Sequence, residues 1–214
     1  MKKIRLLFAA VLALTMLLAG CGADPGREVS LGLITDGVYE NEYLDVRFAP
    51  EGWQLYGAED LQESLKGVTS MLRGTELEKE LEDLTQVMDM QAIAPNGTTN
   101  VNVVYTQMSA VEWAANQALS EEEAMDAVLD QREKLFESYE AVGIHPETME
   151  KCTVTYCGEQ RMGTKTAGTV QGIPCYILQI YERTLGPYSV VVTMTAFGED
   201  TTAEIAEMFE KPIA

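Results

Sequence analysis

Alternating hydrophobic and polar positions recur in short stretches along the chain, a pattern typical of β-strands. The segments that we expect as strands are Val29–Leu33, Tyr43–Phe48, Met90–Ala94, Val101–Gln107, Cys152–Cys157, Arg161–Val170, Cys175–Glu182 and Ser189–Phe197. The turn signals Asp36-Gly37, Asn96-Gly97 and Gly186-Pro187 lie between neighbouring segments. Because consecutive strands with short connections pair as neighbours, this order predicts a mainly antiparallel sheet.

Other segments place apolar residues at helical spacing behind a capping signal. The predicted helices begin near Asp60, near Thr75, at Ser120 and at Asp200-Thr201. The helix from Ser120 is expected to run to Gly143, with His145 in the loop after it. The closing helix is expected to place Ile205, Met208 and Phe209 on one side. The fold class is therefore α+β, a mainly antiparallel β-sheet covered by helices on both faces (an α/β/α sandwich).

The start of the chain resembles an export signal. Lys2, Lys3 and Arg5 precede the apolar run Leu6–Ala19, which is too short to span a bilayer of about 30 Å. The run ends in Leu18-Ala19-Gly20-Cys21, which resembles the bacterial lipoprotein box, in which the cysteine is lipidated.

This interpretation divides the chain into a lipoprotein signal peptide (1–20), a lipidated N-terminus with a short linker (21–28) and one domain (29–214). It anchors the mature protein to the extracytoplasmic face of a bacterial cell membrane through lipid on Cys21. The alternatives are an ordinary signal peptide that happens to meet a cysteine and an inefficient membrane anchor.

Charge excludes one class of partner. The 214 residues include 15 Lys and Arg against 34 Asp and Glu, which gives a net charge of −19. A surface this acidic repels phosphate backbones, so we expect no nucleic-acid partner.

The residues that usually carry chemistry do not form a recognisable set. His145 is the single histidine, and no Gly-x-Ser-x-Gly elbow accompanies it. Cys152, Cys157 and Cys175 lack zinc-knuckle spacing. A disulfide between Cys175 and one of the others is an alternative to three small core residues. The acidic runs contain no calcium loop. We therefore expect no catalytic residue, no metal and no cofactor.

Aromatic residues around the turn Pro50–Trp53 form the candidate binding surface. These residues are Trp53, Tyr39, Tyr43 and Tyr56. Aromatic rings can line a pocket for a sugar or a peptide, but a tryptophan in a turn also commonly plugs the edge of a core.

The segment Asn41–Phe48 running into Pro50-Glu51-Gly52-Trp53 resembles the start of PsbP-like domains. The polar strand near Asn100–Tyr105, the helix after it and the terminal hairpins follow the same order of elements. The resemblance implies an antiparallel sheet between helices. It also implies a binding or assembly role, because members of this family are mostly accessory factors.

Two hypotheses on function follow. The first is a lipid-anchored, non-catalytic binding or accessory module of a membrane or cell-envelope complex, with an unidentified envelope protein as partner. The alternative is a small-molecule or metal-binding lipoprotein that feeds a transporter. An envelope hydrolase that uses two carboxylates ranks below both.

Overall fold

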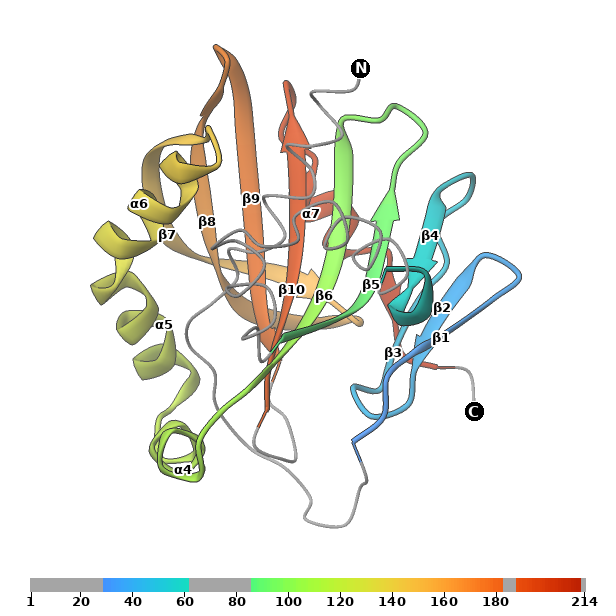
Figure 1. Cartoon of the computed structure of the whole chain (residues 1–214), viewed down its shortest axis with the longest axis horizontal. Coiled ribbons are helices and arrows are strands. Elements are labelled where there is room, and N and C mark those ends of the chain that lie inside the picture. Colours follow the sequence, from blue (N-terminus) through green and yellow to red (C-terminus); the bar gives the residue numbers. More distant parts are fainter. Residues whose placement is uncertain (1–28, 62–85, 183–187, 213–214) are drawn as a thin grey trace, which may run out of the picture.

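Two antiparallel sheets and a set of short helices make up the protein (Figure 1). The structure is a computed structural model, and it describes residues 29–61, 86–182 and 188–212. Seven strands form the large sheet, in the order β4-β5-β6-β10-β9-β8-β7. Their bounds are β4 (Gln54–Gly57), β5 (Gln86–Ile93), β6 (Thr99–Gln107), β7 (His145–Tyr156), β8 (Glu159–Val170), β9 (Ile173–Glu182) and β10 (Tyr188–Phe197). Every pairing in it is antiparallel, which confirms the mainly antiparallel sheet.

A small sheet of four strands lies over part of the large one, in the order β1-β2-β3-β11. Its strands are β1 (Leu33–Thr35), β2 (Val38–Asn41), β3 (Val46–Phe48) and β11 (Phe209–Glu210). The end of the described chain therefore pairs with its beginning, and the rings of Phe48 and Phe209 stack with centroids 4.4 Å apart.

The helices are short. Those that lie wholly within the described residues are α4 (Ala110–Gln117), α5 (Glu121–Asp130), α6 (Arg132–Ala141) and α7 (Thr202–Ala206). Capping boxes open α4 at Ser109 and α5 at Ser120, each with a glutamate three residues on. Figure 1 shows α4, α5 and α6 along one side of the large sheet, and α5 and α6 contact its strands β7 and β8.

Apolar side chains pack against both faces of the large sheet. On one face, Val103, Val192 and Ile180 pack with residues of the small sheet and with Ile205 of α7. On the other face, Cys175 and Ile177 of β9 pack with α5 and α6. The small sheet and α7 thus pack on one face of the large sheet, and α5 and α6 pack on the other. Helices covering both faces remain a prediction.

The hairpin around Asn96-Gly97 and the last four strands lie where the sequence predicts them, with changed ends. The first hairpin differs from the prediction. Its strands directly flank Asp36 and Gly37, whose φ values are 53° and 77°. This geometry matches a two-residue turn, so Tyr43 lies in the next turn and not in a strand.

Three predictions near the helices are wrong. The helix expected from Ser120 to Gly143 is two helices, which meet at Gln131. His145 begins strand β7 instead of lying in a loop, because an edge strand with a β-bulge next to Pro146 tolerates the proline. Phe209 pairs in β11, where it stacks on Phe48 instead of extending α7.

Helix α4 was not predicted, although Ser109 and Glu112 carry the same capping signal as Ser120. The helices expected after Asp60 and Thr75 fall largely on residues 62–85, which lie outside the described residues, as do residues 1–28 with Cys21. Within the described ranges, no helix combines the length and apolar character needed to cross a membrane.

Candidate functional site

An open pocket lies at the tip of the β7–β8 hairpin, with a volume of about 400 Å³. We call it the hairpin pocket. Five parts of the chain line it: the β2–β3 turn with the start of β3, the first turn of α5, the β7–β8 hairpin, the end of β9, and the residue after β11. The lining residues are Leu44, Asp45, Val46, Glu121, Tyr156, Cys157, Glu159, Arg161, Glu182 and Lys211.

The turn Cys157-Gly158 shapes this pocket. Both residues have positive φ, 51° and 74°, as a two-residue hairpin turn requires. The turn pairs Tyr156 directly with Glu159 across the hairpin. The Cys157 thiol donates to the carbonyl oxygen of Glu210, 3.6 Å away, which links the hairpin tip to β11. Burial and the nearby Glu182 carboxylate raise the pKa of Cys157 to about 12, so this thiol is protonated at neutral pH.

Both bases of the pocket are already paired. The Arg161 guanidinium lies 3.1 Å from Glu182 Oε2 and 3.6 Å from Glu121 Oε1. Lys211 Nζ lies 2.6 Å from Glu159 Oε1. Hydrogen bonding and charge from Lys211 lower the pKa of Glu159, and Glu159 in turn raises the pKa of Lys211. These pairs fix the charged groups around the opening.

Two residues of the pocket carry buried polar groups: the Tyr156 hydroxyl and the Glu182 carboxylate. Tyr156 is 1% exposed and Glu182 is 7% exposed. The pKa of Tyr156 is raised by burial, then by the charge of Glu182 and by hydrogen bonding to it, so the two groups face each other. The open volume and the ion pairs around it make the hairpin pocket the candidate site.

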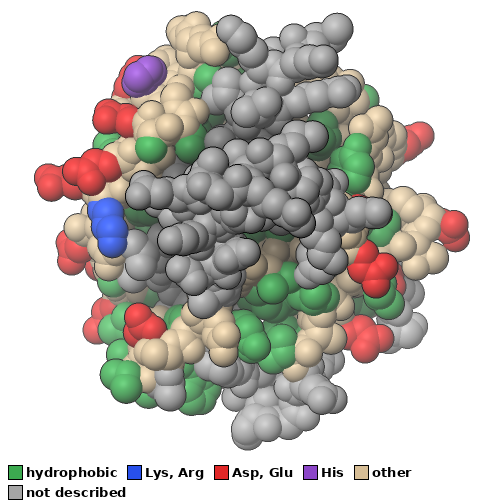
Figure 2. Space-filling view, in the orientation of Figure 1, with side chains coloured by type: hydrophobic (Ala, Val, Ile, Leu, Met, Phe, Trp, Pro, Cys, Tyr) green, Lys and Arg blue, Asp and Glu red, His purple; other side chains and the backbone are tan. Residues whose placement is uncertain are grey.

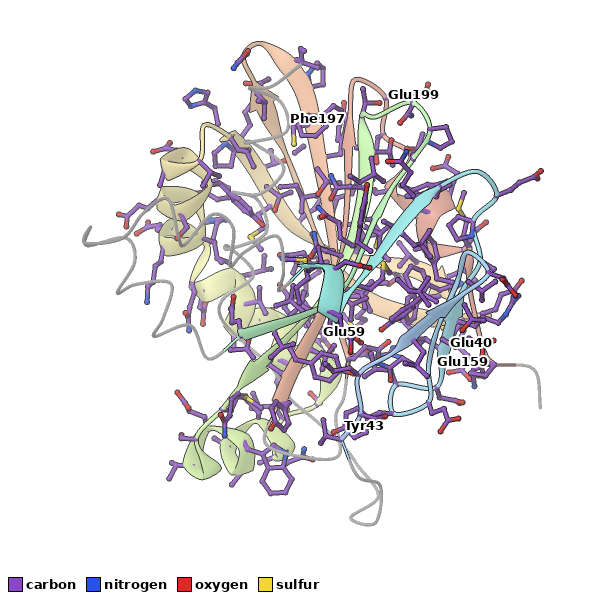
Figure 3. All side chains as sticks on the ribbon, turned by 45° about the vertical axis from the view of Figure 1, so that its right-hand side comes forward. Glu40, Tyr43, Glu59, Glu159, Phe197 and Glu199 are labelled. Carbon is purple, nitrogen blue, oxygen red and sulfur yellow. The ribbon has the colours of Figure 1, made fainter. Side chains whose placement is uncertain are left out.

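No local pattern in the sequence indicates this set of residues, because Glu121, Tyr156, Glu182 and Lys211 are far apart along the chain. Figure 3 shows Glu159 well apart from Phe197 and Glu199. In Figure 2, acidic side chains outnumber basic ones on the visible face, in keeping with the net charge of −19.

A second polar cluster, centred on a buried carboxylate, links the two sheets. Asp89 is fully buried at a β-bulge of β5, between Met88 and Met90. It accepts hydrogen bonds from the Gly32 N–H (2.8 Å), the Tyr39 hydroxyl (2.6 Å) and Asn41 Nδ2 (2.7 Å). Burial raises the pKa of Asp89, although these hydrogen bonds partly offset the shift. The network holds β1 and β2 on the large sheet and is closed to solvent.

The four aromatic residues of the candidate surface do not share one surface. Tyr39 and Tyr43 are buried between the sheets, where Tyr39 binds Asp89 and Tyr43 lies 6.3 Å from the ring of Tyr105. The partly exposed ring of Trp53 stands edge-on to Phe48, with centroids 5.7 Å apart. Tyr56 lies on β4 next to Leu55, whose side chain packs into the core between the sheets. Since neighbouring side chains of a strand point to opposite faces, Tyr56 faces away from the other three.

The cysteines and the histidine are also apart. Cys152 and Cys157 border the core between the sheets, whereas Cys175 lies in the core beneath α5 and α6. All three are free thiols. His145 lies at the far end of β7 from the hairpin tip. Across the described ranges, no three His, Cys, Asp or Glu side chains gather as a metal site.

A row of polar side chains crosses all seven strands of the large sheet, on the face that bears α5 and α6. In the order of the strands the row is Tyr56, Gln91, Asn102, Thr193, Gln179, Thr164 and Lys151. Its β8–β9 part is hydrogen-bonded, since Gln179 Oε1 accepts from the hydroxyls of Tyr139 and Tyr181. Both amide atoms of Asn102 are buried without a partner. The hairpin pocket has an open volume bordered by charged pairs, and it is therefore the stronger candidate.

Comparison with known proteins gives matches among solved structures alone. No family model and no curated protein match the chain. Among solved structures, the chain is similar to cyanobacterial PsbP (CyanoP) from Synechocystis sp., with 11% identity and a TM-score of 0.46. The match covers 91% of this chain and 99% of that chain. This structural neighbour comes from the family that the sequence resembles, whereas the hairpin pocket is defined by the residues of this chain alone.

Proposed function

We propose that this protein is a lipid-anchored, extracytoplasmic binding or accessory module, without catalytic activity, that holds a partner of the cell envelope at the hairpin pocket. The observation that carries the proposal is the hairpin pocket, an open volume of about 400 Å³ bordered by the ion pairs of Arg161 with Glu182 and of Lys211 with Glu159. A volume of this size lies within the range of binding sites.

The start of the chain supports the anchored location. Lys2, Lys3 and Arg5, the apolar run Leu6–Ala19 and the lipoprotein box ending at Cys21 form a consistent export and lipidation signal. Two acyl chains at ~0.8 kcal/mol per buried methylene would hold the protein at the membrane despite its acidic surface.

Lipid anchoring is tested separately from binding. Cells that express the full chain are labelled with an alkyne fatty acid, and the membrane fraction is compared with that of a Cys21→Ala variant. We expect label and membrane retention in the wild type and loss of both in the variant. An unlabelled wild-type protein would overturn the anchor.

Binding is tested by cross-linking in the same cells, followed by mass spectrometry. We compare the wild type with Tyr156→Phe, which removes only one hydroxyl from the residues that line the pocket. Tyr56→Phe is the matched control, because its exposed hydroxyl bonds only Gln54 among the described contacts. The proposal expects one envelope complex that is reduced by Tyr156→Phe and kept by Tyr56→Phe. Equal recovery with both variants would overturn it, and recovery of a transporter permease would favour the solute-binding alternative.

A further inference from the structure

We propose that one end of the protein rests on the lipid bilayer and places exposed apolar side chains among the lipids. This end comprises residues 29–33 and helix α4, and we call it the α4 end. The inference rests on the proposed function, because it takes the lipid anchor at Cys21 as given and names the surface that the anchored domain turns toward the membrane.

Exposed apolar side chains gather at the α4 end. Val111 of α4 is 80% exposed, and Leu33, at the start of β1, is 75% exposed. Leu31 and Val29 are 40% and 36% exposed. Only two of the six large apolar side chains that are exposed within the described ranges lie elsewhere. Apolar side chains that gather on one surface commonly mark an interaction surface.

Helix α4 contributes little to the core. The side chains of residues 111–117 are all exposed or half-buried, whereas α5, α6 and α7 each bury at least two side chains. The first turn of α4 is fixed locally, by the capping box of Ser109 and Glu112. Most helices in proteins are stabilised by packing of an apolar face. The exposed side of α4, which includes Val111, is available for a contact outside the fold.

The two parts of the α4 end lie at the lower end of the molecule in both Figure 1 and Figure 3. Helix α4 follows Gln107, the last residue of β6, whereas the β5–β6 hairpin and the start of β9 lie at the other end of the large sheet. The described chain begins at Val29, eight residues after Cys21. At about 3.3–3.6 Å per residue, this length of chain spans less than about 30 Å. Val29 is therefore held within that distance of the lipid on Cys21.

Charge favours the same orientation. The chain has a net charge of −19, and an acidic surface is repelled by anionic lipids. Residues 29–34 carry no charged side chain, and residues 110–119 carry one, Glu112. This carboxylate accepts hydrogen bonds from the N–H and the hydroxyl of Ser109, at 2.9 and 2.7 Å. The α4 end can therefore approach an anionic bilayer with little repulsion, while more acidic parts of the surface are turned away.

The two tryptophans of the chain report on the two ends of the protein. Trp113 lies in α4. Trp53 follows Gly52, which lies near Pro95 of the β5–β6 hairpin at the other end of the large sheet. Trp53→Phe keeps Trp113 as the single tryptophan, and Trp113→Phe keeps Trp53.

The mature, lipidated forms of both variants are purified from membranes and reconstituted into vesicles of phosphatidylcholine and phosphatidylglycerol. The acyl chains either carry bromine or do not, and bromine quenches indole emission only at short range. We expect brominated lipid to quench the emission of Trp113 and to leave that of Trp53 unchanged.

Two substitutions in the Trp53→Phe protein test the apolar contact. Leu33→Glu and Val111→Glu each replace an exposed apolar side chain by a charged one, and a glutamate is favourable in the first turn of α4. We expect each to lower the ratio of docked to free domains at least about tenfold, because the transfer of an apolar side chain out of water is lost. Quenching of Trp113 falls accordingly. Ile173→Glu is the matched control, because Ile173 is 53% exposed at the other end of the large sheet and should leave the quenching unchanged.

Equal quenching of Trp113 and Trp53, or quenching of neither, overturns the inference. Quenching of Trp113 that persists in both Leu33→Glu and Val111→Glu also overturns it. A dimer in detergent that Val111→Glu separates, with Trp113 unquenched in vesicles, would assign the α4 end to a second copy of the chain and overturn the inference. A protein without lipid on Cys21 overturns the proposed function as well, whereas a lipidated protein with unquenched Trp113 overturns this inference alone.

Discussion

The buried carboxylate of Asp89 provides a quantitative test of the contact between the two sheets. Asp89→Asn keeps the shape of the side chain and can keep one oxygen facing the Gly32 N–H. It then places an amide NH₂ against Asn41 Nδ2, which lies 2.7 Å from Asp89 Oδ2. Two donors face each other, so a charge-assisted hydrogen bond is lost and a buried donor is left unmet. We expect a loss of about 2–4 kcal/mol in the free energy of unfolding, reduced by whatever is gained from removing a buried charge.

Asn41→Asp creates the opposite conflict, because two carboxylates then meet in the same buried space. Two unit charges 4 Å apart repel by about 4 kcal/mol at an effective dielectric constant of 20. The exchange Asp89→Asn with Asn41→Asp restores a donor opposite an acceptor. The carboxylate introduced at position 41 would still accept from the Leu44 N–H, as Asn41 Oδ1 does now at 2.9 Å, and the Tyr105 hydroxyl can turn to donate.

We therefore expect the double variant to lie within about 1 kcal/mol of the wild type. With losses of about 2–4 and about 4 kcal/mol in the two single variants, this corresponds to a coupling energy of about 5–7 kcal/mol. The measurement is urea unfolding of the mature protein followed by circular dichroism, with midpoint and slope compared for the four proteins. A double variant as unstable as the sum of the two single variants would refute the reasoning.

The same variants give a pH test with a defined sign. Burial raises the pKa of Asp89 above its ordinary value of 3.8, so the folded protein holds this proton more tightly than the unfolded chain. The stabilisation from that proton is complete when the pH is below the ordinary pKa of 3.8. It is lost as the pH rises through the pKa that Asp89 has in the folded protein. The stability advantage of the wild type over Asp89→Asn should therefore shrink across this window. An advantage that grows with pH would contradict the assignment.

Three further predictions concern single positions. Ser120→Ala removes the N-cap of α5 and should cost about 1 kcal/mol in urea unfolding, whereas an unchanged midpoint would contradict the capping role. Gly163→Ala places a methyl group against the carbonyl oxygen of Gln179 and should lower the melting temperature by several degrees, whereas Gly57→Ala, which meets only ordinary contacts, should not. The Cys157 thiol, with its pKa raised to about 12, should react with iodoacetamide at pH 8 at least about tenfold more slowly in the folded protein than in urea, and equal rates would contradict its burial.

Local signals in the sequence predict much of the fold. The Asn96-Gly97 turn with its flanking strands and the Ser120 capping box are short-range patterns, and both are present in the structure. These features need only neighbouring residues, because turn and cap geometries are set by local backbone preference and side-chain hydrogen bonds.

Features that depend on distant residues could not be predicted in this way. Phe209 continues a helical pattern in the sequence, yet stacking on Phe48 places it in a strand. An acidic residue such as Asp89 is expected at the surface, yet it lies buried at the β-bulge of β5. The hairpin pocket joins Tyr156, Glu182 and Lys211 only after the strands are in register.

The pairing of β11 with β3 also sets an order of assembly. A ribosome makes Val46–Phe48 long before Phe209–Glu210, and a chain that emerges from its N-terminus cannot complete the small sheet until Phe209–Glu210 have emerged. Until then the Phe48 ring lacks its stacking partner, and the edge of β3 offers unpaired backbone groups to other chains. A chaperone that shields strand edges would therefore protect the nascent protein most before Phe209–Glu210 emerge.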